Sequence, residues 1–238
     1  MNWHAKSSRH FILPKSWQEL QKGGQYAEQL KNYFSPWYER VLGYQFLNIG
    51  GLSGEIACDL PLRHQIVLLP EIEEKTAALL AKKELSLLLA DLAELPFVQQ
   101  SIDACLLANT LNFYADPHQL LREVHRVLTD DGYLFIALFN PCSGLLFKRK
   151  LNKANSPSLP FRHYCTFRVI DWLQLLNFDI LEQRQLSAWN AHLSVIVAQK
   201  RTYPLTLNPQ KVRLKTPEFL QPLEAFSSNQ PILEESYE

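Results

Sequence analysis

Residues Leu85–Pro141 decide the fold: LSLLLADLAELPFVQQSIDACLLANTLNFYADPHQLLREVHRVLTDDGYLFIALFNP. Three short, nearly unbroken apolar runs lie in this stretch, at 85–90, 104–108 and 133–139. Runs of this kind are typical of strands that are buried on both faces of a parallel sheet. A helix is predicted between the second and third runs, so the stretch contains a strand–helix–strand crossover.

Clear start and stop signals mark the predicted helix. Asp116 is a suitable N-cap, and Pro117 fits the first helical position, where its missing N–H is not needed. Gly132 allows the chain to turn into the third strand after an Asp-Asp-Gly turn. One face of the helix is apolar and consists of Leu120, Leu121, Val124, Val127 and Leu128.

The same stretch resembles the second half of a class I S-adenosylmethionine-dependent methyltransferase domain, in particular the type 11 group. The resemblance rests on the order and spacing of Asp91, 94–97 (ELPF), 102–104 (IDA), 116–117 (DP), 121–123 (LRE), 126–128 (RVL) and 131–132 (DG). The whole chain is similar to a poorly characterised bacterial branch of that family. The resemblance implies an α/β, Rossmann-like, seven-stranded and mostly parallel sheet of order 3-2-1-4-5-7-6. The last strand is antiparallel and helices cover both faces. It also implies S-adenosyl-L-methionine as the cofactor.

Length and composition fit one ordinary α/β domain. The chain has 238 residues, of which 47% are hydrophobic, so it can form a full core. The 24 basic and 24 acidic residues balance, which argues against broad binding to nucleic acid. No apolar stretch is long enough to span a membrane and no secretion signal is visible, so we expect a cytoplasmic protein.

The four cysteines are scattered and form no Cys-x-x-Cys pair. We interpret Cys58, Cys105, Cys142 and Cys165 as reduced thiols and predict no metal site. Cys105 lies in a predicted core strand.

Three parts are predicted along the chain. Residues 1–43 form a helical lead-in or cap, 44–200 the methyltransferase domain, and 201–238 a mobile, proline-rich tail. Residues 1–16 are expected to be loose. The helical pattern from Trp17 to Leu42 is divided at Gly23-Gly24, and Ser35-Pro36 can restart it. This helix either packs across the sheet edge or covers the cofactor cleft.

Further elements follow from shorter patterns. Strands are predicted at 44–49, 66–69, 178–183 and 193–200, and helices at 55–60 and 73–83. Another helix is predicted from Phe167 to Leu176, with Thr166 as its cap and Asn177 in place of a terminal glycine.

A glycine turn, Gly50-Gly51-Leu52-Ser53-Gly54, follows the first strand. Such a turn lets the backbone approach a ligand closely. The resemblance implies that Gly50, Gly51 and Gly54 bind the cofactor, although a purely structural turn is the alternative. The family usually has an acidic residue and a middle glycine where this chain has Asn48 and Leu52.

Two acidic residues at strand ends are candidates for the nucleoside part of the cofactor. Glu71 ends the second strand about twenty residues after the glycine turn, where an acid can bind ribose hydroxyls. The alternative is a solvated glutamate at a helix start. The resemblance implies that Asp91 accepts a hydrogen bond from the adenine amino group, with the Leu92 backbone beside the ring. The alternative is that Asp91 caps the next turn.

Asn109 ends the fourth strand beside the point where the strand order reverses, so cofactor and acceptor are expected to meet there. Methyl transfer from a sulfonium requires alignment and needs a base only for a protonated acceptor. We therefore name no catalytic residue. His118 and His125 are expected to face solvent and not to bind metal. The basic segment 143–164 is either a solvated loop or a lid for an anionic acceptor.

The favoured function is methylation of a small-molecule acceptor. The first alternative is a methyltransferase-fold binding or regulatory protein with weak or no activity, which Asn48 and Leu52 motivate. The second is a nucleotide-sugar or nicotinamide enzyme on a related sheet. The cluster at 91–97 argues against that alternative.

Overall fold

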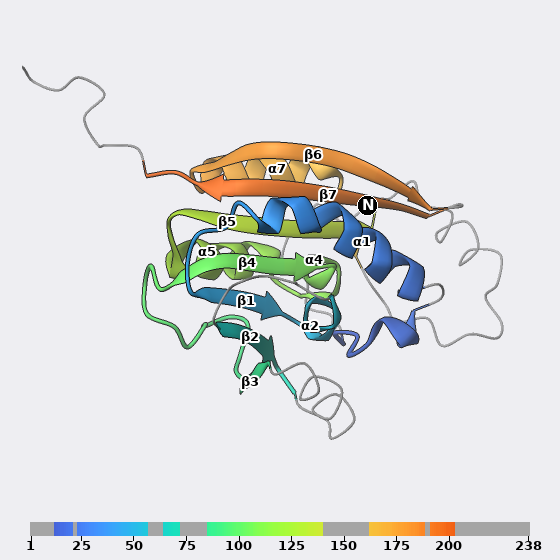
Figure 1. Ribbon diagram of the computed structural model, residues 1–238, viewed down its shortest axis with the longest axis horizontal. Helices are drawn as coiled ribbons and strands as arrows, with labels where there is room; N and C mark the ends of the chain where they lie inside the picture. The colour runs from blue at the N-terminus through green and yellow to red at the C-terminus, as the bar shows by residue number, and fades with distance from the viewer. Residues whose placement is uncertain are drawn as a thin grey trace, which may run out of the picture. The chain divides into compact units, whose positions relative to one another are not determined.

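The computed structural model describes residues 12–20, 23–56, 64–71, 85–139, 162–188 and 191–202. A single seven-stranded sheet runs through them in the order β3-β2-β1-β4-β5-β7-β6 (Figure 1). The strands are β1 (Gln45–Ile49), β2 (His64–Leu69), β3 (Ser86–Leu89), β4 (Ile102–Ala108), β5 (Leu128–Phe139), β6 (Phe178–Ala188) and β7 (Ala191–Lys200). The first five pair in parallel, and β7 is antiparallel to both β5 and β6. The predicted fold is confirmed.

Helices lie on both faces of this sheet. They are the 3-10 helix η1 (Trp17–Glu19), α1 (Gly23–Tyr38), α2 (Gly51–Glu55), α4 (Thr110–Phe113), α5 (Pro117–Val127) and α7 (Thr166–Leu175). On one face α1 places Phe34 5.4 Å from Phe135 of β5, measured between ring centroids. The opposite face packs against α5 and α7. Figure 1 shows α1 in front of the sheet and these two helices behind it.

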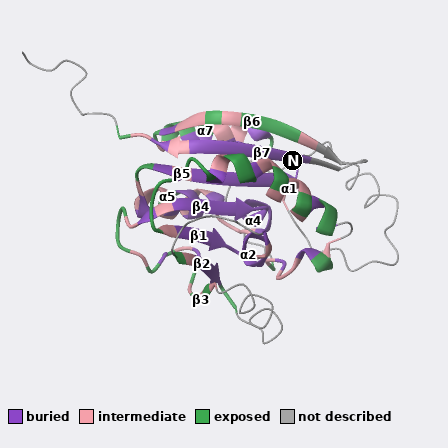
Figure 2. Cartoon of the chain, viewed as in Figure 1, coloured by how far each residue is buried: buried purple, intermediate pink, exposed green. Residues whose placement is uncertain are grey.

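The sheet is most deeply buried at its centre, as Figure 2 shows for β1, β4 and β5. Strand β3 departs from the prediction that all three apolar runs are buried on both faces. Leu89 is 58% exposed, and Leu87 and Leu88 are only partly buried. The reason is position, because β3 is the edge strand and packs only beside β2 in the sheet.

Local helix signals were correct for α5 and for the end of α7. Asp116 Oδ1 accepts a hydrogen bond from Gln119 N at 3.1 Å, and Pro117 is the first helical residue. Asn177 has a φ of 58°, the left-handed conformation that a terminal glycine would provide. The predicted cap of α7 is wrong. Thr166 is its first residue and Cys165 its N-cap, without a side-chain hydrogen bond.

Helix α1 is continuous through Pro36, so the predicted restart at Ser35-Pro36 is wrong. A proline inside a helix removes one backbone hydrogen bond and normally bends or ends the helix. Here Leu30, Phe34 and Tyr38 form an unbroken buried face on both sides of Pro36. We attribute the continuity to the packing of that face on the sheet. The predicted division at Gly23 is confirmed, because α1 begins there.

Several predicted boundaries shift. Strands β6 and β7 form one long hairpin joined at 189–190, whereas the prediction placed the connection at 184–192. The Asp130–Gly132 turn lies within β5, with Asp131 at a φ of 64°. The glycine turn itself forms α2, which ends at Glu55, and Ile56 is extended.

Other predictions lie outside the described residues. They are the remainder of the helix at 55–60, the helix at 73–83, most of the basic segment 143–164, and the tail from residue 203 onward.

Candidate functional site

The glycine turn is held at the place where the strand order reverses, between the carboxyl ends of β1 and β4. The Ile49 carbonyl accepts hydrogen bonds from Ser53 Oγ at 2.8 Å and from Thr110 Oγ1 at 2.6 Å. Ser53 Oγ also accepts from Ala108 N at 2.9 Å. Two buried hydroxyls therefore fix the turn to β4.

Glycine is required at the first two positions of this turn. Gly50 has a φ of 91°, which L side chains rarely adopt. A Cβ there would lie 3.2 Å from Thr110 Oγ1 and 3.4 Å from Leu13 Cδ2. At Gly51 a Cβ would collide with the backbone of Lys15. Close backbone approach was predicted for a ligand, but in this structure the approaching group is the chain's own N-terminal segment.

We call residues 12–17 the N-terminal strap. Its end is anchored by Trp17, which is 2% exposed. Trp17 Nε1 donates to the Leu52 carbonyl at 2.8 Å, and Trp17 N donates to Glu55 Oε2 at 3.0 Å. The expectation of a loose lead-in is therefore wrong for residues 12–16, while 1–11 lie outside the described residues.

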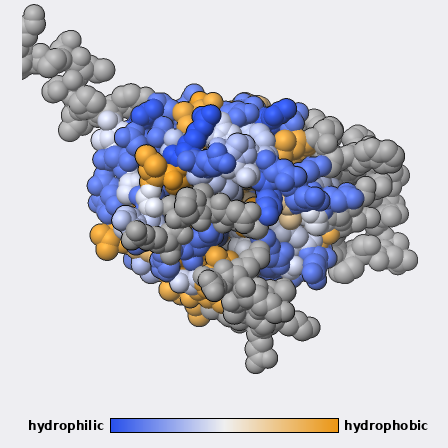
Figure 3. Space-filling model, in the orientation of Figure 1, coloured by the Kyte–Doolittle hydropathy of each residue, from blue (hydrophilic) through white to orange (hydrophobic). Residues whose placement is uncertain are grey.

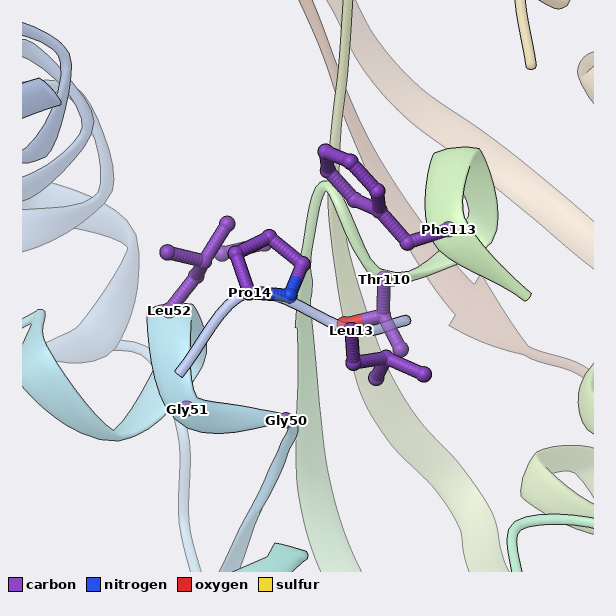
Figure 4. A pocket seen from close by; sticks show the side chains of 8 residues that line it. Leu13, Pro14, Gly50, Gly51, Leu52, Thr110 and Phe113 are labelled. Carbon is purple, nitrogen blue, oxygen red and sulfur yellow. The ribbon is translucent and has the colours of Figure 1, made fainter. Parts of the chain in front are cut away.

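The strap fills the space above the glycine turn. Pro14 is buried, and Leu13 packs against the cores on both faces of the sheet. In Figure 4, Pro14 lies between Leu52 and Phe113, and Leu13 lies beside Thr110. The remaining space between these side chains is too narrow to hold a water molecule.

Two buried asparagines lie just after β4: Asn109 at its carboxyl end and Asn112 in α4. Asn109 is fully buried with a φ of 59°, and its Nδ2 donates to Asn112 Oδ1 at 3.4 Å. Within the described residues Asn109 Oδ1 has no hydrogen-bond partner. Asn112 Oδ1 also accepts from Phe139 N at 3.1 Å, and its Nδ2 donates to the Arg162 carbonyl at 2.6 Å. Arg162 N donates back to the Asn112 carbonyl at 2.7 Å.

The loop after β3 carries Asp91 and Leu92. Asp91 is exposed, and its Oδ1 accepts from Ala93 N at 2.9 Å, so it does cap the turn. This contact leaves the adenine role as a proposal. The Leu92 side chain is 1% exposed and lies in the core, so only its backbone can face a ligand.

Helix α5 holds this loop through an ion pair. Arg126 donates to the carbonyls of Leu95 and Phe97, each at 2.8 Å. Glu123 Oε2 accepts from Leu95 N at 2.9 Å and from Arg126 Nη2 at 2.8 Å. The hydrogen bond from Arg126 is the main reason that the pKa of Glu123 is lowered. Sequence reasoning noted both residues but not this role, because their partners lie about thirty positions away.

Tyr114 connects the Asp91 loop with the end of β4. Burial, followed by the negative charges of Asp91 and Asp116, raises the pKa of Tyr114 to about 12. Tyrosine is protonated at neutral pH in any case, and the raised pKa extends this form to higher pH.

Two further residues were predicted to bind the cofactor. Glu71 is exposed just beyond β2. Gly54 N donates to the Gly50 carbonyl at 3.2 Å inside α2.

His118 and His125 are half-buried, so the expectation that they face solvent holds only in part. His118 packs 4.1 Å from Trp172 of α7, and His125 packs 5.6 Å from Phe178 of β6, measured between ring centroids. Burial is the main cause that lowers the pKa of each imidazole. In the part of the chain that the structure describes, no three His, Cys, Asp or Glu side chains are grouped to hold a metal ion.

The described surface on the face seen in Figure 3 is mainly hydrophilic, with hydrophobic atoms in small separate patches. No described helix is both long and apolar enough to cross a membrane.

Comparison with known proteins agrees with this geometry. The family described as "Methyltransferase domain" matches residues 47–136, from β1 into β5. The uncharacterized protein YafS of Escherichia coli is 36% identical over 236 residues, covering 91% of this chain and 93% of YafS. This chain belongs to the class I S-adenosylmethionine-dependent methyltransferase family. S-adenosylmethionine is the cofactor of that family.

Solved structures show the same fold at low identity. A SAM-dependent methyltransferase of Methanosarcina mazei has a TM-score of 0.53 and 21% identity, covering 69% of this chain and 96% of that one. A Thermotoga maritima methyltransferase has a TM-score of 0.52 and 19% identity, covering 78% and 99%. The latter is described as a possible histamine N-methyltransferase. These likenesses concern the fold alone.

The glycine cradle and the cofactor fit only in part. Gly50 and Gly51 present a backbone without side chains, which permits the close approach of another group. Leu13, Pro14 and Lys15 lie on that backbone in this structure, so the cradle does not admit the cofactor while the strap is in place.

Proposed function

We propose that this chain methylates a small-molecule acceptor with S-adenosylmethionine as the donor. One observation carries the proposal most strongly: the glycine turn is hydrogen-bonded into the reversal point of the sheet, within the segment that matches the methyltransferase domain. Ligands of open α/β sheets bind outside the carboxyl ends of the strands at this point.

Each site residue is proposed for one part of the cofactor. The backbone at Gly50, Gly51 and Gly54 would face its amino-acid part, and the exposed carboxylate of Glu71 would bind the ribose hydroxyls. Asp91 would accept from the adenine amino group beside the Leu92 backbone. Asn109 has a buried amide oxygen without a hydrogen-bond partner among the described residues, and it lies where cofactor and acceptor would meet.

The chemistry makes few demands on side chains. The bound sulfonium would supply a methyl group that is already activated, so the protein has to align the acceptor and exclude water. Asn112 fixes the ends of β4 and β5 against each other and provides a rigid support for that alignment. No residue is assigned as a general base.

A small acceptor agrees with the charge of the chain. The 24 basic and 24 acidic residues leave no net positive charge. A nucleic-acid substrate normally requires a basic surface, so a small molecule is favoured.

Calorimetry with S-adenosylhomocysteine tests the proposal. Gly50→Val should abolish binding, because its side chain would enter the cradle at a φ that valine rarely adopts. Asp91→Ala should weaken binding about tenfold by removing one charge-assisted hydrogen bond. Asp171→Ala, which removes an exposed carboxylate on α7, is the matched control and should bind as the wild type does. Unchanged binding by Asp91→Ala would show that the adenine site is misplaced.

A second candidate is a binding or regulatory protein that keeps the fold without catalysis. Asn48 favours it, because this buried asparagine replaces the family's acid and its Oδ1 has no hydrogen-bond partner within the described residues. Leu52 replaces the middle glycine and lines the filled pocket. A correctly folded protein that binds no S-adenosylhomocysteine at millimolar concentration would select this candidate.

A further inference from the structure

We infer that the N-terminal strap is a displaceable plug, which occupies the cofactor cradle and must leave it before the cofactor binds. The inference rests on the proposed function and adds a regulatory contact to that site. Strap and cofactor would then compete for the same backbone surface.

The strap is in direct contact with the cradle. Leu13 reaches the space beside Gly50, and the Lys15 backbone lies directly on Gly51. Pro14 fills the gap between Leu52 and Phe113, and the space left over cannot hold a water molecule (Figure 4). A lid that closes over a bound ligand would leave room beneath it. This segment instead rests on the surface that the ligand needs.

The strap consists of an anchor, Trp17, and a plug, residues 12–15. Trp17 is fixed by two hydrogen bonds to α2, through Leu52 and Glu55, and it is almost fully buried. Leu13 and Pro14, in contrast, fill the cradle with apolar side chains. Apolar contacts of two residues are weak enough for a ligand to replace. The anchor can therefore stay in place while residues 12–15 move away.

Competition predicts a specific effect on affinity. The apparent affinity of a site falls in proportion to the fraction of molecules in which the site is open. Weakening the contacts of the plug should raise that fraction and tighten cofactor binding. If the strap were instead a lid that closes over the bound cofactor, weakening its contacts should loosen cofactor binding.

The test compares two variants of the strap, each of which truncates a four-carbon side chain to alanine. Binding of S-adenosylhomocysteine to each is measured by calorimetry. Leu13→Ala should bind about tenfold more tightly than the wild type, because it removes a side chain from the cradle. Ile12→Ala is the matched control, since Ile12 is 61% exposed and should leave binding unchanged. Equal or weaker binding by Leu13→Ala would overturn the inference.

Hydrogen exchange on the wild-type protein gives a second readout that needs no variant. Adding S-adenosylhomocysteine should increase exchange in a peptide that covers residues 12–17. Decreased exchange there would identify a closing cover and overturn the plug.

The two proposals fail in different ways. Binding that is equally tight in the wild type and in Leu13→Ala refutes the plug and leaves the methyltransferase proposal intact. No binding by either folded protein at millimolar concentration refutes both proposals, because the plug is defined by competition with a cofactor that binds.

Discussion

Ser53 and Thr110 stabilise a turn that its glycines only make possible. Glycine permits the φ of 91° at Gly50, but it supplies no side chain to hold that conformation. The two hydroxyls do so by donating to the same carbonyl, that of Ile49. The rigid position of the cradle thus depends on two hydroxyls that bind a backbone carbonyl within the chain.

Ser53→Ala should reduce the free energy of unfolding by about 1–3 kcal/mol, because the buried Ala108 N–H would lose its acceptor. Urea denaturation followed by circular dichroism measures the change. Ser86→Ala is the control, since its hydroxyl contacts His64 at the exposed sheet edge and its loss should change the same quantity by less than about 0.5 kcal/mol. Equal values for the two variants would contradict the role given to Ser53.

Of the residues that form the cradle, the sequence indicated the glycines but not the two hydroxyls that hold the turn in place. Gly50 and Gly51 stand out because glycine has a recognisable conformational use. Ser53 and Thr110 do not stand out, because the sequence alone does not show that both hydroxyls converge on one carbonyl. Asp91 was placed correctly after β3, but only the structure shows which of its two expected contacts is made within the chain.

Among the elements, α5 does more than cover the sheet. Its Glu123–Arg126 pair binds the backbone of the loop that carries Asp91. The helix was predictable from local signals at Asp116 and Pro117, whereas the loop contacts depend on tertiary structure. The predicted strand order already placed β3 at the sheet edge, but the exposure that follows from this position was missed, because its apolar run was interpreted as a strand buried on both faces.

Arg126→Met should destabilise the protein by about 1–3 kcal/mol and release the loop, because two part-buried carbonyls lose a charged donor. Hydrogen exchange should increase at 93–97, and urea denaturation gives the free energy. Arg122→Met on the same helix is the control, since Arg122 donates to Gln119 at the exposed surface. A loop that exchanges at the wild-type rate in Arg126→Met would show that the ion pair does not hold it.

Over the whole molecule, two half-buried histidines link α5 to α7 and β6. Burial lowers the pKa of both His118 and His125, so the unfolded chain binds more protons than the folded one near the pKa of a free histidine. The stability that depends on their neutral form is complete above about pH 6.5. It is lost as the pH falls through that value toward the lower folded pKa.

The variant His118→Gln/His125→Gln should therefore lose less stability than the wild type on acidification from about pH 7.5 to 5.5. Urea midpoints at several pH values measure the slope. Identical slopes in both proteins would contradict the assignment of this pH dependence to the two histidines.

The order of the strands was predictable, because the matching residues from Leu85 to Pro141 occur in the order that the family requires. The N-terminal strap was not. Leu13 and Gly50 are far apart in the chain, and nothing in the composition of residues 12–17 indicates that they pack on a glycine turn. Polar neighbours made the segment resemble a loose terminus, whereas Pro14 and Trp17 are buried.

Asn112 has an evolutionary meaning as well as a structural one. Its side chain accepts a hydrogen bond from Phe139 N at the end of β5 and donates one to the Arg162 carbonyl, which precedes α7. One amide therefore joins two parts of the chain that are far apart in sequence. A replacement at this position removes both contacts at once, so evolution is expected to tolerate few other residues there.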